Sequence, residues 1–229
     1  MTLILHYAPD NASLCVRLAL EELGLLYETT LVDRRQQGQK LPGFLALNPN
    51  GLIPVLETPD GALYETAAIL LWLADRHGGG LMPGVQDSRR GAALKWLFWL
   101  SNTLHAQMRL LFYPDQYIDG SDHVTALLSR TRTRLRAQFD LLANAQDAPW
   151  LDSAQPSAQG CYLAALLRWP ALYGGATDWF RLDDWERLRS FAERTEARPA
   201  SQRAARAEGL GARPFSMPMS ASPDNNSAT

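Results

Sequence analysis

The sequence has very few cysteines and no long apolar run. Only two of its 229 residues are cysteines, Cys15 and Cys161, and they form neither a CxxC pair nor the framework of a secreted, disulfide-bonded domain. No apolar run reaches the roughly 18 residues of a membrane-spanning helix. The N-terminus has no basic segment followed by an apolar core and a small-residue cleavage site. These absences predict a soluble protein in the reducing cytoplasm.

The sequence also lacks strong charge of one sign and the spacing of a metal site. Its net charge is -2, which gives no global field that favours nucleic acid or an anionic membrane. The four arginines between 130 and 136 stand at alternate positions and therefore spread around a helix instead of lining one face. The four histidines show no metal-ligand spacing, and no phosphate-binding loop is present. We therefore expect no metal, no nucleic acid partner and no membrane partner.

The first third of the chain alternates strand and helix signals. The sequence predicts strands at 3–5 and 27–32 and a hairpin at 55–64. It also predicts a first helix, which has Ser13 as its N-cap and ends at Gly24, a short helix at 42–47 and a helix at 67–77. Residues 34–40 read as a polar loop. A βαβ unit followed by a hairpin and a helix predicts one mixed sheet with helices on its faces.

After a glycine-rich linker, every strong periodicity is helical. Apolar residues recur at helical spacing between 94 and 112 and between 128 and 142, and the run from Cys161 to Trp169 is apolar almost all round, which is typical of the central helix of a bundle. Two short helices are predicted at 183–197 and 200–208. We predict four segments, namely a first domain at 1–78, a linker at 79–87, an all-α domain at 88–210, and an extended or disordered tail at 211–229.

The segment from Asn48 to Thr66 carries the strongest functional signal. Pro54 stands at the head of an apolar strand, where it cannot donate to the sheet, and it is a candidate for a cis peptide bond. A cis bond would leave the amide and the carbonyl of Ile53 free to pair with an extended ligand. Thr66 is predicted at a helix start, where unpaired amides hold a carboxylate. Together these features predict a site for a small acidic peptide.

On these residues the chain resembles the cytosolic glutathione transferases, and the bacterial members most. The resemblance covers roughly residues 2 to 210, and its most specific parts are Asn48 to Leu56, Glu65-Thr66 and the stretch from Arg198 to Leu210. It implies a thioredoxin-like first domain, an all-α second domain, glutathione as co-substrate, a homodimer and a small hydrophobic electrophile as second substrate. We place the dimer contact on Leu63, Ile69, Trp72 and the long helix.

The resemblance assigns most of the glutathione site. Ile53, between Leu52 and the cis Pro54, would pair with the cysteinyl backbone, and Glu65 with Thr66 would hold the γ-glutamyl end. The glycyl carboxylate would face Gln39 and Lys40. Thr66 stands where the family usually has serine, which keeps the hydroxyl. In the turn that opens the buried helix, Ser157-Ala158-Gln159-Gly160 lacks the usual acidic residue, which puts the capping of that helix in question.

The catalytic position departs from the family, because Ala12 stands where many bacterial members have cysteine. We predict that the protein activates the thiolate of glutathione with a donor, Ser13 first and Asn11 second. Ser13 could instead serve only as the N-cap of its helix. His105, in a Leu-His pair that faces the sulfur in bacterial members, and Tyr7, at the end of the first strand, are further candidates for a catalytic role.

Two functions from different classes follow. The leading one is an enzyme that activates glutathione for conjugation or for the reduction of peroxides or disulfides, and the alternative is a non-catalytic binding module with the same fold. A reactive role for Cys15 in the first turn of its helix is weighed against a small buried core residue, and the buried residue is favoured. Phe112 and Tyr113 could line the electrophile pocket or belong to the core. The sequence does not name the second substrate.

Overall fold

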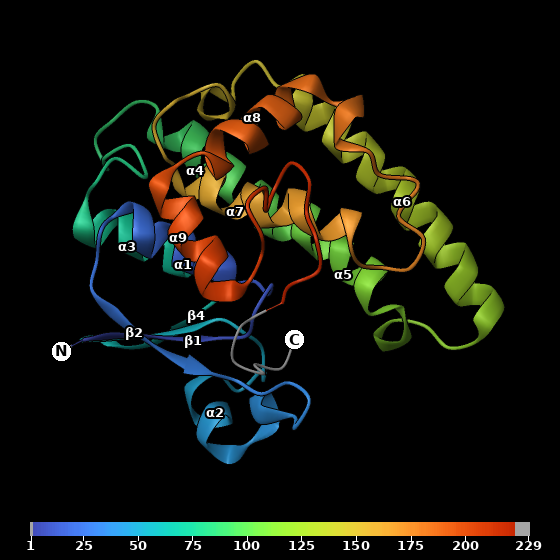
Figure 1. Ribbon diagram of the computed structural model, residues 1–229, viewed down its shortest axis with the longest axis horizontal. Helices are drawn as coiled ribbons and strands as arrows, with labels where there is room; N and C mark the ends of the chain where they lie inside the picture. Colours follow the sequence, from blue (N-terminus) through green and yellow to red (C-terminus); the bar gives the residue numbers. More distant parts are fainter. Residues whose placement is uncertain (1, 223–229) are drawn as a thin grey trace.

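The computed structural model describes residues 2–222, which fold into a small mixed sheet next to a larger body of helices (Figure 1). The sheet has the strand order β2-β1-β3-β4. Strand β1 (Leu3–Tyr7) pairs in parallel with β2 (Tyr27–Leu31) and antiparallel with β3 (Val55–Thr58), and β3 forms a hairpin with β4 (Gly61–Tyr64). This mixed sheet is the one predicted from the alternating signals.

Three helices cover the sheet. Helices α1 (Ser13–Glu22) and α3 (Thr66–His77) lie on the face toward the helical body, and α2 (Pro42–Leu47), preceded by the short 3₁₀ turn η1 (Gly38–Lys40), lies on the opposite face (Figure 1). This is the thioredoxin-like arrangement that the resemblance implies. The face under α2 has only a small core of Val32, Phe44 and Val55. The face under α1 and α3 belongs to a core that continues into the helical body.

The helical body contains the remaining elements. Its α-helices are α4 (Arg90–Trp99), α5 (Ala106–Phe112), α6 (Ser121–Ala143), α7 (Ala158–Arg168), α8 (Glu186–Glu196) and α9 (Pro199–Glu208). Short 3₁₀ turns join them at η3 (Pro114–Gln116), η4 (Pro149–Leu151), η5 (Trp169–Ala171) and η6 (Leu182–Asp184). Every residue of α7 is buried, so the prediction of a central bundle helix is confirmed.

One long helix runs from α4 through η2 (Leu100–His105) to α5, and η2 is π-helical. Such widened turns inside α-helices occur frequently at functional sites. Here the π-helical segment contains His105 and begins at Leu100, which is fully buried. The predicted helical periodicity between 94 and 112 is therefore one helix with a local change of pitch.

Two helix caps differ from expectation. The N-cap of α1 is Ala12 without a side-chain bond, while the Ser13 hydroxyl donates to the Ala8 carbonyl at 3.1 Å, so Ser13 is not the N-cap. The backbone places Ser13 one position inside the helix, from which its hydroxyl points back into the preceding loop. At α7 the Ser157 hydroxyl accepts from the Gly160 amide at 3.0 Å, so this helix is capped without the acidic residue.

One of the residues assigned to the dimer contact lies inside the chain. Ile69 is fully buried in the core, so it cannot contact a partner. By contrast, Leu63 and Trp72 remain partly exposed. Within residues 2–222 no helix is both long enough and apolar enough to cross a bilayer.

Candidate functional site

A cavity of about 1290 Å³ opens between the sheet and the helical body. Its wall contains nine of the eleven residues predicted for the site, which come from both parts of the fold. They are Asn11, Gln39, Lys40, Leu52, Ile53, Pro54, Glu65, Thr66 and His105. The two predicted residues outside this wall are Ser13 and Tyr7.

The loop before β3 presents free main-chain groups to this cavity. The Asn48 side chain fixes the loop, because its Oδ1 accepts from the Asn50 amide at 3.0 Å and its Nδ2 donates to the Leu52 carbonyl at 2.7 Å. The Ile53-Pro54 peptide bond is cis. The amide and the carbonyl of Ile53 have no hydrogen-bond partner among residues 2–222. Ile53 therefore offers one donor and one acceptor to an extended ligand.

The start of α3 lies beside Ile53 in the same wall. Glu65 has φ +71° and ψ +108°, a conformation that is uncommon for a residue other than glycine and that often marks functional sites. Thr66, which is buried, is the first residue of the helix. The unpaired amides of this helix start and the Thr66 hydroxyl suit a carboxylate, and the exposed Glu65 carboxylate suits an ammonium group.

Gln39 and Lys40 reach the wall through a close approach of η1 to the loop before β3. Gly51 has φ +62°, and a Cβ there would lie 2.9 Å from the Gln39 carbonyl oxygen and 3.0 Å from Lys40 Nζ. Only glycine fits this conformation and this contact. The glycine of the Asn-Pro-Asn-Gly turn therefore lets Gln39 and Lys40 pack close to the loop that carries Ile53, and all three residues line the cavity.

The start of α1 forms another part of the wall. Asn11 Oδ1 accepts from the Ala12 amide at 2.8 Å, and among residues 2–222 the side-chain nitrogen Nδ2 of Asn11 has no hydrogen-bond partner, so it is a donor available in the cavity wall. Ala12, which also lines the wall, has no side-chain group that could act as a nucleophile. This part of the wall therefore offers the positive end of α1 and one amide donor.

Ser13 and Tyr7 lie away from the cavity. Ser13 is fully buried and its hydroxyl is engaged with Ala8. Tyr7 packs under the Arg17 guanidinium, whose central carbon lies 4.6 Å from the ring centroid. The hypothesis that the Ser13 hydroxyl or Tyr7 donates to a ligand sulfur therefore has no support in this geometry, whereas Asn11 does line the wall.

His105 lies in the wall with its ring packed against Tyr162 and Trp169, at centroid distances of 5.7 and 5.3 Å. Its Nδ1 lies 2.8 Å from the Tyr162 hydroxyl. Burial, with a smaller effect from Arg109, lowers the pKa of His105 from 6.5 to about 4. Burial also raises the pKa of Tyr162, which stays protonated. His105 is therefore neutral at physiological pH, and a Tyr162 hydroxyl that donates to Nδ1 leaves the Nε2 proton free.

A buried ion pair holds the loop that carries Asn11. Arg168 donates from Nε and Nη2 to the two carboxylate oxygens of Asp10 at 2.8 and 2.9 Å, and both side chains are almost completely buried. The Asp10 amide donates to the Glu208 carboxylate at 2.9 Å. Two more side chains donate to Asp10, those of Trp169 and Tyr173. The Asp10 carboxylate is thus fully engaged, and it fixes the position of Asn11.

The tail after α9 closes one side of the cavity, where Ser220 and Ala221 contribute to the wall. Arg168 donates to the carbonyls of Pro214 and Met219, so the side chain that fixes Asp10 also holds the tail. The sequence predicts an extended or disordered tail, and up to residue 222 the tail is held against the helical body by these hydrogen bonds. The rest of that prediction, 223–229, lies outside the described residues.

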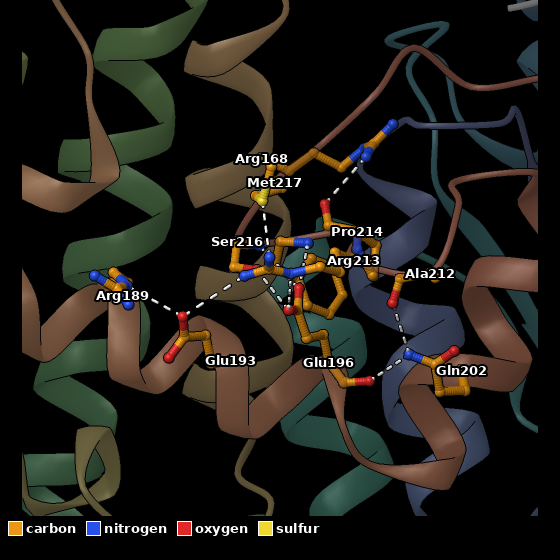
Figure 2. A network of polar contacts seen from close by, with 11 residues as sticks. Arg168, Arg189, Glu193, Glu196, Gln202, Ala212, Arg213, Pro214, Ser216 and Met217 are labelled. Atoms are coloured by element: carbon orange, nitrogen blue, oxygen red, sulfur yellow. Dashed lines mark hydrogen bonds and ion pairs between the residues drawn. The ribbon is translucent and has the colours of Figure 1, made fainter.

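A second anchor holds the middle of the tail. Figure 2 shows the carboxylate of Glu196, on α8, directed at the tail, where it accepts from the amides of Phe215 and Ser216 at 3.1 and 2.9 Å and from the Ser216 hydroxyl. Phe215 is buried. The wall formed by the tail is therefore attached to the core at several points.

The two cysteines do not reach the cavity wall. Cys15 and Cys161 are buried, and burial raises the pKa of both thiols. A thiol with a raised pKa is a poor nucleophile, so the interpretation of Cys15 as a small core residue is the one the structure favours.

Several residues of the wall had no clear signal in the sequence. Ser101, Asn102 and Arg109, on the same long helix as His105, line the wall together with Phe112 and Tyr113, which sequence analysis left open between pocket and core. The sequence places Arg34 only in a polar loop and places Tyr162 and Trp169 only in a buried helix, and it gives no signal for Tyr173. Their joint position depends on how the two parts of the fold pack, which no local pattern shows.

The chain is similar to known proteins in both sequence and fold. The family model described as "Glutathione S-transferase, N-terminal domain" matches residues 12–76. The solved structure titled "Ternary complex of BphK, a bacterial GST" is 33% identical with a TM-score of 0.73, covering 90% of this chain and 100% of that chain.

Two curated relatives match over nearly their whole length. "Glutathione S-transferase GST-4.5" of Xanthomonas campestris pv. campestris is 29% identical over 208 residues, which are 90% of this chain and 98% of the relative. "Disulfide-bond oxidoreductase YfcG" of Escherichia coli is 27% identical over 215 residues, which are 90% of this chain and 96% of the relative. The similarity therefore extends over both the sheet and the helical body.

Proposed function

This chain belongs to the glutathione transferase family, and from this premise we propose that it transfers the glutathione thiolate to a small electrophile bound in the same cavity. One observation carries the proposal. The free amide and carbonyl of Ile53 lie in the cavity wall together with the starts of two helices, one with Glu65 and Thr66 and one with Asn11. An extended peptide with a carboxylate at each end and a thiol between them matches this arrangement.

Glutathione would bind along this wall through its backbone and both ends. Its cysteinyl amide and carbonyl pair with Ile53, and its γ-glutamyl carboxylate sits at the start of α3 against Thr66. The γ-glutamyl ammonium pairs with the Glu65 carboxylate. The glycyl carboxylate lies by Lys40 and Gln39 at the other end. In this orientation the sulfur points to the start of α1.

The thiolate would be stabilised by donors and not by a protein nucleophile. A free thiol has a pKa near ~8.5, so at neutral pH most glutathione is protonated. The side-chain amide nitrogen of Asn11 and the positive end of α1 favour the thiolate. Each unit by which they lower the pKa of the glutathione thiol corresponds to about 1.4 kcal/mol of thiolate stabilisation. His105 contributes its Nε2 proton as a neutral donor. Because the pKa of His105 is low, its ring is neutral at physiological pH and adds no second positive charge near Arg109.

In the reaction the sulfur lone pair forms a bond to the electrophilic carbon, and the leaving group departs with the bonding electrons. The thiol proton passes to water before the attack. No residue of the protein forms a covalent intermediate, which agrees with the burial of Cys15 and Cys161. The cavity contributes orientation of the two substrates and stabilisation of the thiolate.

Reduction of a disulfide is the second candidate, because the chain is similar to a protein named as a disulfide-bond oxidoreductase. The same thiolate would attack a sulfur atom instead of a carbon atom, and the leaving thiolate would take up a proton. Since neither cysteine reaches the wall, a second glutathione would be needed to complete this reaction. The homodimer stays a prediction, for which light scattering after size exclusion is the measurement.

Steady-state assays separate these possibilities. Protein retained on glutathione resin is assayed with 1-chloro-2,4-dinitrobenzene and, in parallel, with hydroxyethyl disulfide. Turnover of the aryl chloride supports the transferase, and turnover of the disulfide alone supports the reductase. Retention on the resin without turnover of either substrate, or of further electrophiles, would contradict both and favour a binding module.

A further inference from the structure

Among the described residues of the cavity wall are three basic side chains without an acidic partner in residues 2–222. Arg34, in the loop after β2, Lys40, at the end of η1, and Arg109, on α5, all line the cavity. Within the part of the chain that the structure describes, none of them forms an ion pair. This is unusual for the chain, because most of its other buried or half-buried arginines pair with a carboxylate.

The carboxylates of the described wall do not neutralise these cations. They are Asp10, which is engaged by Arg168, and Glu65, which lies at the start of α3. The proposed orientation of glutathione uses Glu65 for the γ-glutamyl ammonium and Lys40 for the glycyl carboxylate. Two positive charges, those of Arg34 and Arg109, are then left for another ligand.

Arg34 and Arg109 meet at one tyrosine although they come from different parts of the fold. Arg34 Nη2 donates to the Tyr113 hydroxyl at 3.2 Å, and the Arg109 guanidinium carbon lies 5.4 Å from the centroid of the same ring. The remaining contacts of Arg109 are long, 3.3 Å to the Tyr117 hydroxyl and 3.4 Å to Gln116 Oε1. Two guanidinium groups at one side chain repel each other, and an anion between them would relieve that repulsion.

The cavity has room for such a ligand beside glutathione. Its volume of about 1290 Å³ exceeds the range of about 300–1,000 Å³ that is usual for small-molecule sites. The wall near the two arginines is aromatic, with Phe112, Tyr113, Trp169 and Tyr173. Aromatic side chains bind a planar, apolar body, while arginine binds a carboxylate through two parallel hydrogen bonds.

We propose that the second substrate carries a carboxylate, which Arg109 and Arg34 bind while the rest of the substrate lies against the aromatic wall. This inference rests on the proposed function and changes the expectation of a purely hydrophobic electrophile. The carboxylate can come from an acidic carbon electrophile or from a glutathione unit in a mixed disulfide, since both present the same group to the arginines.

The test compares two aryl chlorides that differ in charge, neutral 1-chloro-2,4-dinitrobenzene and anionic 4-chloro-3,5-dinitrobenzoate. The measured quantity is the ratio of kcat/KM for the anionic substrate to kcat/KM for the neutral one. We expect Arg109→Gln and Arg34→Gln each to lower this ratio at least tenfold, and Arg109→Lys to retain part of it. Added salt should lower the ratio of the wild type because it screens the interaction. Arg35→Gln, which changes an exposed neighbour outside the wall, is the matched control.

The two sources of the carboxylate are told apart by a parallel assay with the mixed disulfide of glutathione and 2-mercaptoethanol. If Arg109→Gln slows only this reaction, the carboxylate belongs to a second glutathione. If it lowers only the aryl chloride ratio, the carboxylate belongs to a carbon electrophile. If neither reaction responds, or if the arginine variants weaken glutathione binding and leave the ratio unchanged, the proposal is overturned.

The proposal can fail separately from the proposed function. If the wild type turns over neither aryl chloride, the transferase is contradicted, and calorimetric titration with unreactive 3,5-dinitrobenzoate against 1,3-dinitrobenzene still tests the charge preference. Tighter binding of the benzoate that is lost in Arg109→Gln supports the arginine site. Equal binding of both compounds would overturn it.

Discussion

The stability of this protein should depend on the protonation of one histidine in the cavity wall. His105 is neutral when folded because burial and Arg109 lower its pKa to about 4, whereas its unfolded value is 6.5. At acidic pH the unfolded state therefore binds a proton at His105, whereas the folded state does not. The contribution of His105 to stability is complete above pH 6.5 and is lost as the pH falls toward 4.

The size of this effect follows from the two pKa values. Between about pH 7.5 and about pH 5 the unfolded histidine becomes almost fully charged, while the folded one stays mostly neutral. The linkage relation then gives a loss of about 2 kcal/mol in the free energy of unfolding from this residue alone. The loss should approach a limit below pH 4, where both states bind the proton.

Urea unfolding at the two pH values, for the wild type and for His105→Gln, measures this loss. The wild type should lose about 2 kcal/mol more than the variant between the two pH values. His123→Gln, which changes an exposed histidine on α6, should behave like the wild type. Equal losses of unfolding free energy for the wild type and His105→Gln would show that the surroundings of His105 do not keep it neutral. That result would also contradict the role proposed for His105 as a neutral donor.

Three further predictions concern the sulfur, the tail and the cysteines. Asn11→Ala should raise the pKa of the bound glutathione thiol by about one unit, as measured by thiolate absorbance against pH, and an unchanged titration would remove Asn11 from the mechanism. Glu196→Gln should weaken the anchoring of the tail by about 1–3 kcal/mol and raise KM for the electrophile without changing glutathione affinity. Glu186→Gln, on the same helix, is the control. Equal KM values for the wild type and Glu196→Gln would contradict the role of the tail as a wall of the cavity. Replacing Cys15 and Cys161 together by alanine should leave kcat per folded molecule within about twofold, because neither thiol meets substrate, and a loss of more than tenfold would restore a catalytic cysteine.

The parts of the site that depend on local chain chemistry could be predicted from the sequence. Asn48, Gly51 and Pro54 define a turn and a strand start through properties of their own side chains and backbone, and Thr66 marks a helix start. Each signal lies within a few residues of the group that it positions. Ser13 shows the limit of this reasoning, since a hydroxyl at a helix start can accept from the helix or donate to the loop before it. The backbone geometry that decides between the two is set by tertiary packing.

The parts that depend on packing between the sheet and the helical body could not be predicted. Arg34 and Arg109 meet at Tyr113 although they are far apart in the sequence, and Arg168 binds Asp10 across the same boundary. Ile69 is another such case, because the sequence does not say which face of α3 packs inside the chain, and the fold buries this residue. Contacts between distant segments leave no local pattern in the sequence from which they could be predicted.

The most direct test of the account is a calorimetric titration of glutathione into the wild type and into Thr66→Val. The free groups of Ile53 and the start of α3 are predicted to hold the tripeptide through its backbone and its γ-glutamyl end. S-methylglutathione should therefore bind with similar affinity, and cysteinylglycine should not bind measurably. Loss of the Thr66 hydroxyl should weaken binding about tenfold, while Thr66→Ser should bind like the wild type. No heat with the wild type, or equal affinities for the wild type and Thr66→Val, would contradict the account.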